Sequence, residues 1–121
     1  MKEKILHKHL LCPRLRIQSG TVIAFGPGKA DLLQALEETG SITNAAARLG
    51  MSYMRAWTLI RTMNRCFCGP LVISVRGGMK GGGGAVLTQT GVRVLALYRK
   101  MEAECLSAAQ SDWRRFAKLL K

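Results

Sequence analysis

The segment 52–65 holds the side chains with the clearest chemical meaning in this sequence. On a helix that turns by about 100° per residue, an apolar face forms from Ala56, Leu59, Ile60 and Met63. The side chains opposite it are Met54, Thr58, Arg61 and Arg65, and Arg55 and Thr62 lie on the flank. A basic, hydroxyl-bearing helix face suits the major groove of DNA, where side chains hydrogen-bond to base edges and to phosphates. The segment is therefore predicted to be a DNA recognition helix.

The predicted contacts of this helix fall into two classes. Base edges are expected to be read by Met54, Arg55 and Thr58. Phosphates are expected to be bound by hydroxyl and cationic side chains in this helix and in a later glycine-rich segment: Ser52, Tyr53, Arg61, Arg65, Arg76 and Lys80. Trp57 has two open interpretations, either as a ring packed between helices or as a contact to the DNA backbone.

The charge of the chain also favours a polyanionic partner. The 121 residues include 19 Lys and Arg against 7 Asp and Glu, which gives a formal charge of +12. No acid occurs between Thr39 and Met101. The basic residues of that stretch are Arg48, Arg55, Arg61, Arg65, Arg76, Lys80, Arg93, Arg99 and Lys100. A surface without carboxylates does not repel phosphate, so the predicted partner is double-stranded DNA. A solvated basic face without a function is the alternative.

Two short helices joined by a glycine turn are predicted to position the recognition helix. Thr43 is expected to cap a first helix over 44–48, whose alanines leave no bulk against a neighbouring helix. Gly50 supplies the turn, and Ser52 caps the second helix. This order of elements is the helix-turn-helix pattern of many DNA-binding domains.

A glycine-rich segment follows, between two apolar runs. The runs 71–75 and 85–87 are predicted to be strands of a β-hairpin, and 76–84 is predicted to be a wing beside the DNA backbone. The segment lacks the Gly-Lys-Ser/Thr sequence that opens a helix in phosphate-binding loops. A small-ligand or phosphate-binding loop and a merely flexible loop remain as alternatives. The acid-free stretch holds no His, Asp or Glu to act as a general base, so no enzyme is predicted.

The remaining elements are predicted to frame this domain. Residues 14–25 are expected to form a short hairpin, the glycine-proline-glycine run 26–28 opens a helix, and Gly40 ends it. A last helix begins after its cap Thr88, and Ser111 is a candidate cap for a separate final helix. The apolar stripe of this helix is longer than one small domain covers, which predicts a homodimer through Val94, Tyr98, Met101, Cys105, Trp113 and Phe116.

Two alternatives to this homodimer are open. The last helix can instead fold back on its own domain. Its aromatic and basic end, 113–116, also permits binding to an anionic membrane surface.

The cysteines and the first residues of the chain indicate the cellular compartment in which the protein is expected. Cys12, Cys66, Cys68 and Cys105 are expected to be free thiols, buried or half-buried, because Cys66 and Cys68 are spaced more tightly than zinc ligands usually are. Neither a metal nor a cofactor is predicted. No segment resembles a signal peptide or an apolar membrane span of about 20 residues, so the chain is expected to be cytoplasmic.

Several motifs together are characteristic of one family. They are Gly-Ser-Ile at 40–42, Ala-Ala-Ala at 45–47, Ser-Tyr-x-x-Ala-Trp at 52–57, Met-Asn at 63–64, the glycines of 77–84 and Leu-Thr-x-x-Gly at 87–91. This combination resembles the amino-terminal winged helix-turn-helix domain of the ModE family of bacterial molybdate-responsive regulators, which is akin to the LysR-type DNA-binding domain. The resemblance implies a dimer with a long helix at its interface and a two-fold symmetric operator. Ligand-binding modules follow this domain in the family, and the sequence ends at Lys121, so molybdate sensing is not implied.

The predicted fold class is mainly α with a small β-sheet, as a winged helix-turn-helix with a long C-terminal dimerisation helix. The predicted divisions are an N-terminal extension over 1–26, a DNA-binding domain over 27–91 and the dimerisation helix over 92–121. The predicted function is that of a sequence-specific transcriptional regulator that binds duplex DNA as a homodimer.

Overall fold

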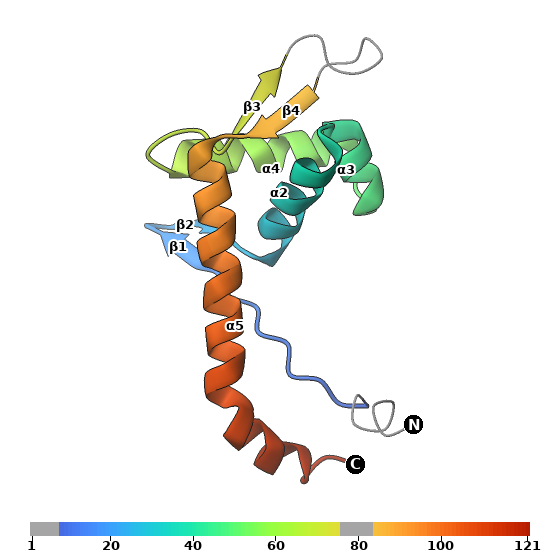
Figure 1. The fold of residues 1–121 in the computed structure, drawn as a ribbon, viewed down its shortest axis with the longest axis vertical. Coiled ribbons are helices and arrows are strands. Elements are labelled where there is room, and N and C mark those ends of the chain that lie inside the picture. Colours follow the sequence, from blue (N-terminus) through green and yellow to red (C-terminus); the bar gives the residue numbers. More distant parts are fainter. Residues whose placement is uncertain (1–7, 76–83) are drawn as a thin grey trace.

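The computed structural model describes residues 8–75 and 84–121. Within them the chain is mainly helical, with two small antiparallel sheets and a long C-terminal helix (Figure 1). The elements are β1 Ile17–Ser19, β2 Val22–Phe25, α2 Pro27–Thr39, α3 Ile42–Arg48, α4 Tyr53–Cys66, β3 Val72–Val75, β4 Gly84–Leu87 and α5 Gln89–Ala117. The prediction of a mainly helical chain with a small β component is confirmed.

The first hairpin and α2 form as predicted. β1 and β2 pair antiparallel, with Ser19 opposite Val22. Pro27 is the first residue of α2, where its missing N–H would have no partner in the helix, and Gly40 ends the helix in the left-handed conformation at φ 68°. The leucines of α2 are buried, so this helix forms the centre of the core.

The start of α3 differs from the prediction. Ser41, not Thr43, is the cap, because Ser41 has an extended backbone and its Oγ accepts a hydrogen bond from the backbone N–H of Asn44 at 3.1 Å. Thr43 is exposed within the first turn of the helix. The small side chains of Ala45 and Ala46 are buried, which lets α3 pack closely on α2 and α4.

The second sheet is attached to the end of α2. β3 and β4 pair antiparallel, with Val72 opposite Leu87 and Val75 opposite Gly84, which confirms the predicted hairpin strands. The backbone N–H of Ala85 donates to the carbonyl oxygen of Gly40 at 3.1 Å. Apart from Gly84, the predicted wing lies outside the described residues.

The first third of α5 packs on the core and fixes the direction of the helix. The Tyr98 ring lies edge-on to Phe25 with 5.0 Å between ring centroids, and its hydroxyl donates to the carbonyl oxygen of Leu15 at 2.7 Å. Burial is the largest cause that raises the pKa of Tyr98, so the phenol stays neutral and keeps this hydrogen bond. Thr88 caps the helix as predicted, because its Oγ1 accepts from the N–H of Gly91 at 3.0 Å.

The rest of α5 extends beyond the core as one unbroken helix (Figure 1). Ser111 lies within it, so the candidate break at this residue is wrong. The segment between residue 8 and β1 runs toward the C-terminal end of α5 (Figure 1). Its Leu11 lines an apolar hollow together with Trp113 and Phe116. Among the described residues, no helix combines the length and apolar character that crossing a bilayer requires.

Candidate nucleic-acid interface

A tight turn sets the position of α4 against the core. Gly50 adopts the left-handed conformation at φ 67°, which a side chain would disfavour, and the next N–H, of Met51, donates to the carbonyl oxygen of Ala46 at 3.0 Å. Ser52 then caps α4 as predicted, because its Oγ accepts from the backbone N–H of Arg55 at 3.0 Å. The turn therefore places the first residues of α4 at the surface while α3 stays packed behind them.

The inner face of α4 matches the sequence prediction closely. Ala56, Ile60 and Met63 are at most 1% exposed, whereas Leu59 is only half-buried at the margin of the core. Trp57 is also half-buried and packs against the core, which is the first of its two predicted interpretations. Burial of this face leaves the opposite side of the helix free for a partner.

The described residues of the predicted DNA-binding set lie together on the outer side of α4. All of them are exposed: Ser52, Tyr53, Met54, Arg55, Thr58, Arg61 and Arg65. Arg76 and Lys80, which complete the predicted set, lie outside the described residues. The described members of the predicted set are thus exposed on a single helix and its cap.

The threonine hydroxyls of α4 already donate hydrogen bonds within the helix. Thr58 Oγ1 donates to the carbonyl oxygen of Met54 at 2.9 Å, and Thr62 Oγ1 donates to that of Thr58 at 3.0 Å. Each threonine hydroxyl has a single proton, so both donors are used within the helix. The exposed face therefore carries the Thr58 hydroxyl as predicted, but this hydroxyl is available to a partner only as a hydrogen-bond acceptor. Ser52 differs, because its Oγ accepts the capping hydrogen bond and its hydroxyl proton remains free to donate.

A shallow hollow of about 510 Å³ opens on the same surface. It is lined by Tyr53, Met54, Trp57, Thr58 and Arg61. Met54 is 67% exposed and Tyr53 is 46% exposed, and the two side chains line this one hollow together. The surface of α4 is therefore apolar as well as basic.

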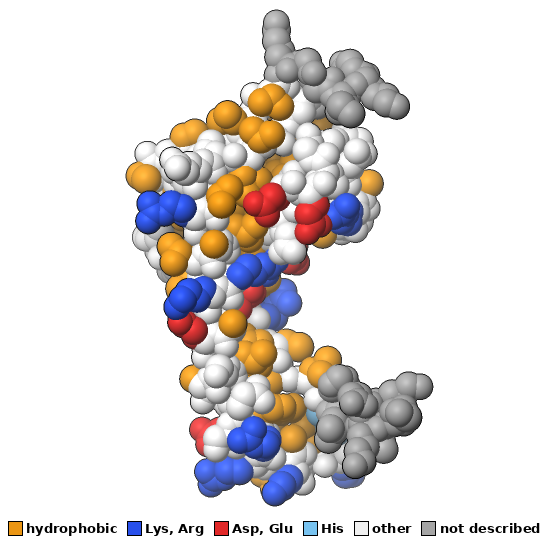
Figure 2. Space-filling view, viewed as in Figure 1, with side chains coloured by type: hydrophobic (Ala, Val, Ile, Leu, Met, Phe, Trp, Pro, Cys, Tyr) orange, Lys and Arg blue, Asp and Glu red, His pale blue; other side chains and the backbone are white. Residues whose placement is uncertain are grey.

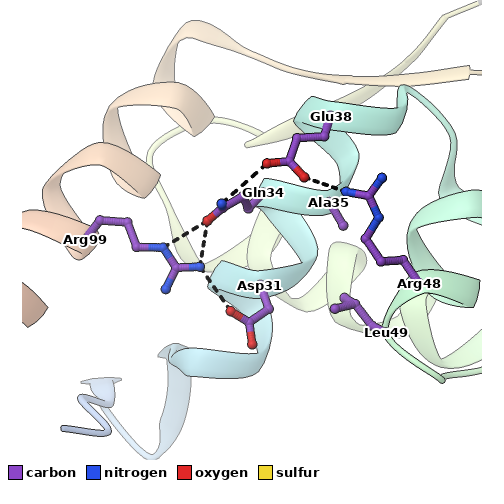
Figure 3. Close-up of a pocket in the computed structure, with 7 residues that line it drawn as sticks. All are labelled: Asp31, Gln34, Ala35, Glu38, Arg48, Leu49 and Arg99. Atoms are coloured by element: carbon purple, nitrogen blue, oxygen red, sulfur yellow. Dashed lines mark hydrogen bonds and ion pairs between the residues drawn. The ribbon is translucent and has the colours of Figure 1, made fainter. Parts of the chain in front are cut away.

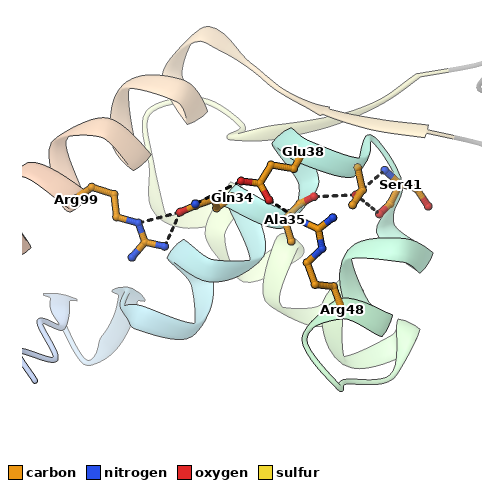
Figure 4. Close-up of polar contacts among 7 residues, drawn as sticks. Gln34, Ala35, Glu38, Ser41, Arg48 and Arg99 are labelled. Atoms are coloured by element: carbon orange, nitrogen blue, oxygen red, sulfur yellow. Dashed lines mark hydrogen bonds and ion pairs between the residues drawn. The ribbon is translucent and has the colours of Figure 1, made fainter. Parts of the chain in front are cut away.

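In the part of the chain that the structure describes, the acidic side chains lie on α2 and α5 and not on α4. Glu38 of α2 pairs with Arg48 at 2.5 Å, and Arg99 of α5 donates to the amide oxygen of Gln34 at 2.9 Å (Figures 3 and 4). Arg99 also reaches Asp31 at 3.0 Å (Figure 3). Burial lowers the pKa of Arg99, but its hydrogen bonds to the carboxylates raise the pKa above the ordinary value, so Arg99 stays charged. These contacts tie α3 and α5 to α2.

The ion pairs divide the basic residues into two groups. Lysine or arginine side chains accompany the carboxylates on the face in Figure 2, and the paired cations are Arg48, Arg99, Lys100 and Arg115. Among the residues that the structure describes, Arg55, Arg61 and Arg65 have no carboxylate within ion-pair distance. Arg48 and Arg99 belong to the basic stretch that was expected to attract phosphate, but their acidic partners on α2 largely neutralise them. The three arginines on the outer side of α4 are among the described arginines without such a partner, together with Arg14, Arg16, Arg93 and Arg114.

Asn64 anchors the end of α4 to the second sheet. Its amide nitrogen donates to the carbonyl oxygen of Val72 at 3.0 Å, and its amide oxygen accepts from the backbone N–H groups of Leu71 and Val72 at 2.8 and 3.2 Å. Sequence analysis recorded Asn64 only as part of a family motif. The sequence does place the Asn64 amide next to Met63, which is buried. A polar side chain close to the core usually has hydrogen-bond partners, and this feature pointed to the anchoring role.

Asn64→Asp is expected to lower the free energy of unfolding by about 1–3 kcal/mol. Aspartate keeps the acceptor but loses the donor, and its charge repels the carbonyl oxygen of Val72. Urea denaturation of the two proteins measures the difference. Asn44→Asp is the matched control, because Asn44 is exposed in the first turn of α3, where a negative charge is mildly stabilising. Equal unfolding midpoints for Asn64→Asp and the wild type would contradict the anchoring role.

The predicted dimerisation stripe is only partly available to a partner. Tyr98 is 1% exposed because its own chain buries it, so its ring is not accessible to a second copy. Met101, Cys105 and Phe116 are exposed, and Val94 and Trp113 are half-buried. A hollow of about 170 Å³ extends this surface toward the first hairpin, through side chains that the stripe did not include: Ile17, Phe25, Phe67 and Leu97.

The four cysteines are free thiols, as expected. Their burial was not predicted correctly, because Cys12, Cys68 and Cys105 are exposed and only Cys66 is half-buried. Between residues 8 and 75 and from 84 onward, His, Cys, Asp and Glu side chains do not gather in a group of three that would hold a metal ion.

Comparison with known proteins gives relatives of one kind. The chain is 41% identical over 95 residues to the molybdenum transport protein ModE of Azotobacter vinelandii, covering 78% of this chain and 35% of that protein. It is 40% identical over 92 residues to the molybdenum-pterin-binding protein MopB of Rhodobacter capsulatus, covering 76% and 34%. It is 44% identical over 72 residues to the DNA-binding transcriptional dual regulator ModE of Escherichia coli K12, covering 60% and 27%.

The extent of these matches is limited. The chain spans about a third of the length of the relatives it matches. No family model matches the chain. Its relatives are transport, regulatory and pterin-binding proteins of the ModE and Mop type, and none of these names denotes an enzyme.

Proposed function

We propose that this protein is a sequence-specific DNA-binding transcriptional regulator. In this proposal α3 and α4 act as a helix-turn-helix, β3 and β4 carry the wing, and α4 enters the major groove of duplex DNA. The observation that carries the proposal is the exposed outer side of α4, whose three arginines have no carboxylate partner in the described part of the chain. A relative named as a DNA-binding transcriptional regulator supports it.

The residues of α4 are proposed to make two classes of contact with DNA. Met54, Arg55 and Thr58 face base edges, and Arg61 and Arg65 bind phosphates. The cap residue Ser52 donates its hydroxyl proton to a phosphate, and Tyr53 binds a phosphate through its phenol. Arg76 and Lys80 remain proposed phosphate contacts on the strength of the sequence alone.

The regulator is proposed to act as a homodimer on a two-fold symmetric site. Leu97 is 55% exposed and Met101 is 38% exposed on α5. Apolar side chains in this number on one helix are typical of a protein interface. A second copy packed on Met101, Cys105, Trp113 and Phe116 would cover them and would set two α4 helices at a fixed spacing, as two half-sites require.

The relatives also connect the proposed regulator with molybdenum. Their names refer to molybdenum transport and to molybdenum-pterin binding. We propose that the genes this protein regulates serve one of these processes. Molybdate sensing is not part of the proposal, because the resemblance covers the DNA-binding domain.

Substitution of two arginines of α4 tests the proposal. Arg55→Ala should weaken binding to a duplex selected from random sequences by about 1–3 kcal/mol and should relax the preference at one position in each half-site, because a bidentate contact to guanine is lost. Arg65→Ala should weaken binding to selected and scrambled duplexes by the same factor, since phosphate has no base identity. Both affinities are measured for both variants at one salt concentration.

The two variants control for each other, because each removes one guanidinium from the same helix. If Arg55→Ala lowers the affinity for the selected and scrambled duplexes equally, Arg55 does not read bases. If the wild type binds the selected duplex no more tightly than the scrambled one, the proposed function is wrong.

A further inference from the structure

The hollow on α4 has a chemical character that phosphate binding does not explain. Its volume is about 510 Å³, and apart from Arg61 its lining is mainly apolar, from Tyr53, Met54, Trp57 and Thr58. The hydroxyl proton of Thr58 is already donated to the carbonyl oxygen of Met54. The outward parts of Thr58 are therefore its methyl group and an oxygen with no proton left to donate.

Few groups of a DNA duplex suit such a surface. In the major groove the bases present hydrogen-bond donors and acceptors, and the apolar group among them is the C5 methyl of thymine. Arg55 and Arg61 are exposed on the same helix and have no carboxylate partner among the described residues, so they draw the polyanion onto this surface. The charge selects DNA as the occupant, and the apolar lining selects one group on it.

We infer that the hollow formed by Tyr53, Met54, Trp57 and Thr58 receives the C5 methyl group of a thymine in each half-site. This inference rests on the proposed function and adds one element of sequence specificity to it. The methyl group leaves water and contacts the Met54 thioether and the Thr58 methyl, while cytosine and the purines offer no group of this kind at the same place.

Deoxyuridine provides a direct test, because it differs from thymidine only by the absence of this methyl group. A duplex selected from random sequences is resynthesised with each thymine replaced in turn by uracil. Burial of one methyl group corresponds to about a fourfold change in affinity. We expect one position in each half-site to show this loss of affinity. Replacement of both thymines should lower the affinity of the dimer for the duplex by about fifteenfold.

A matched pair of variants links the effect to this hollow. Thr58→Ser keeps the hydroxyl and removes the methyl, and Thr58→Val keeps a methyl at that place and removes the hydroxyl. The ratio of affinities for thymine and uracil duplexes should fall toward one in Thr58→Ser and in Met54→Ala. The ratio should stay near the wild-type value in Thr58→Val.

The outcomes separate the inference from the function on which it rests. If every uracil duplex binds the wild type as tightly as the thymine duplex, the inference is overturned and the proposed function stands. If the ratio persists in both Thr58→Ser and Met54→Ala, the methyl group is read elsewhere and the inference is overturned. If the wild type does not prefer any duplex sequence, both are overturned.

Discussion

Gly91→Ala should lower the free energy of unfolding by about 3 kcal/mol or more. Gly91 is buried in the first turn of α5, and a Cβ added there would lie 2.2 Å from the carbonyl oxygen of Leu71. That oxygen also accepts a hydrogen bond from the N–H of Thr88 at 2.9 Å, so relief of the clash would break the connection between β3 and α5. Urea denaturation followed by circular dichroism measures the change.

Gly28→Ala is the matched control for this prediction. Gly28 is exposed in α2, and a Cβ added there meets nothing within 4 Å. Alanine favours the helix over glycine by about 0.5–1 kcal/mol, so this variant should be as stable as the wild type or more so. Equal stability of the two alanine variants would show that α5 does not approach Leu71 as closely as the structure indicates.

Met101→Glu should raise the dissociation constant of the proposed homodimer by at least about 100-fold. The carboxylate would lie in an apolar interface in both copies, and the burial of an unpaired charge costs several kcal/mol. Met101 is already 38% exposed in the single chain, so the fold itself should tolerate the change. Sedimentation equilibrium at micromolar concentration gives the dissociation constants, and circular dichroism confirms that helix is retained.

Ala103→Glu introduces the same charge about 200° farther round α5, on its opposite side. Ala103 is exposed, and the dimer should keep its wild-type dissociation constant in this variant. A wild-type chain that sediments as a monomer at micromolar concentration while its helices are intact would contradict the proposed interface.

The sequence predicted the elements well, because their limits depend on local chemistry. Gly50, Ser52 and Thr88 act where their backbone and capping preferences place them. The same reasoning failed at α3, where Ser41 and Thr43 are both acceptable caps by type. The neighbouring Gly40, which ends α2, leaves Ser41 in the extended conformation that a cap requires.

The candidate site was predictable in its residues but not in its polarity. Periodicity identified the outer side of α4, because Ala56, Ile60 and Met63 define the inner side. It did not show that the hydroxyl of Thr58 is bound to its own helix, since a threonine in a helix has two favourable rotamers.

Contacts between segments that are distant in the chain could not be predicted from the sequence. Tyr98 fitted the apolar stripe of α5, but its ring packs on Phe25 and its hydroxyl reaches Leu15, 83 residues earlier in the chain. The pairing of Arg48 with Glu38 likewise depends on how α2 and α3 pack. A count of charges along the sequence does not contain this packing, so it treated Arg48 as an unpaired cation.

The salt dependence of DNA binding tests the central claim most directly. A double variant, Arg61→Gln with Arg65→Gln, removes up to four phosphate contacts from a dimer, and each contact contributes about 0.9 to the slope of log affinity against log salt concentration. A second double variant, Arg114→Gln with Arg115→Gln, removes the same charge from exposed positions near the far end of α5. The account predicts that the α4 variant flattens the slope by about 3 to 4 and that the α5 variant leaves it unchanged. Equal flattening in the two variants would contradict the account, because the duplex would then respond to the total charge of the protein and not to the surface of α4.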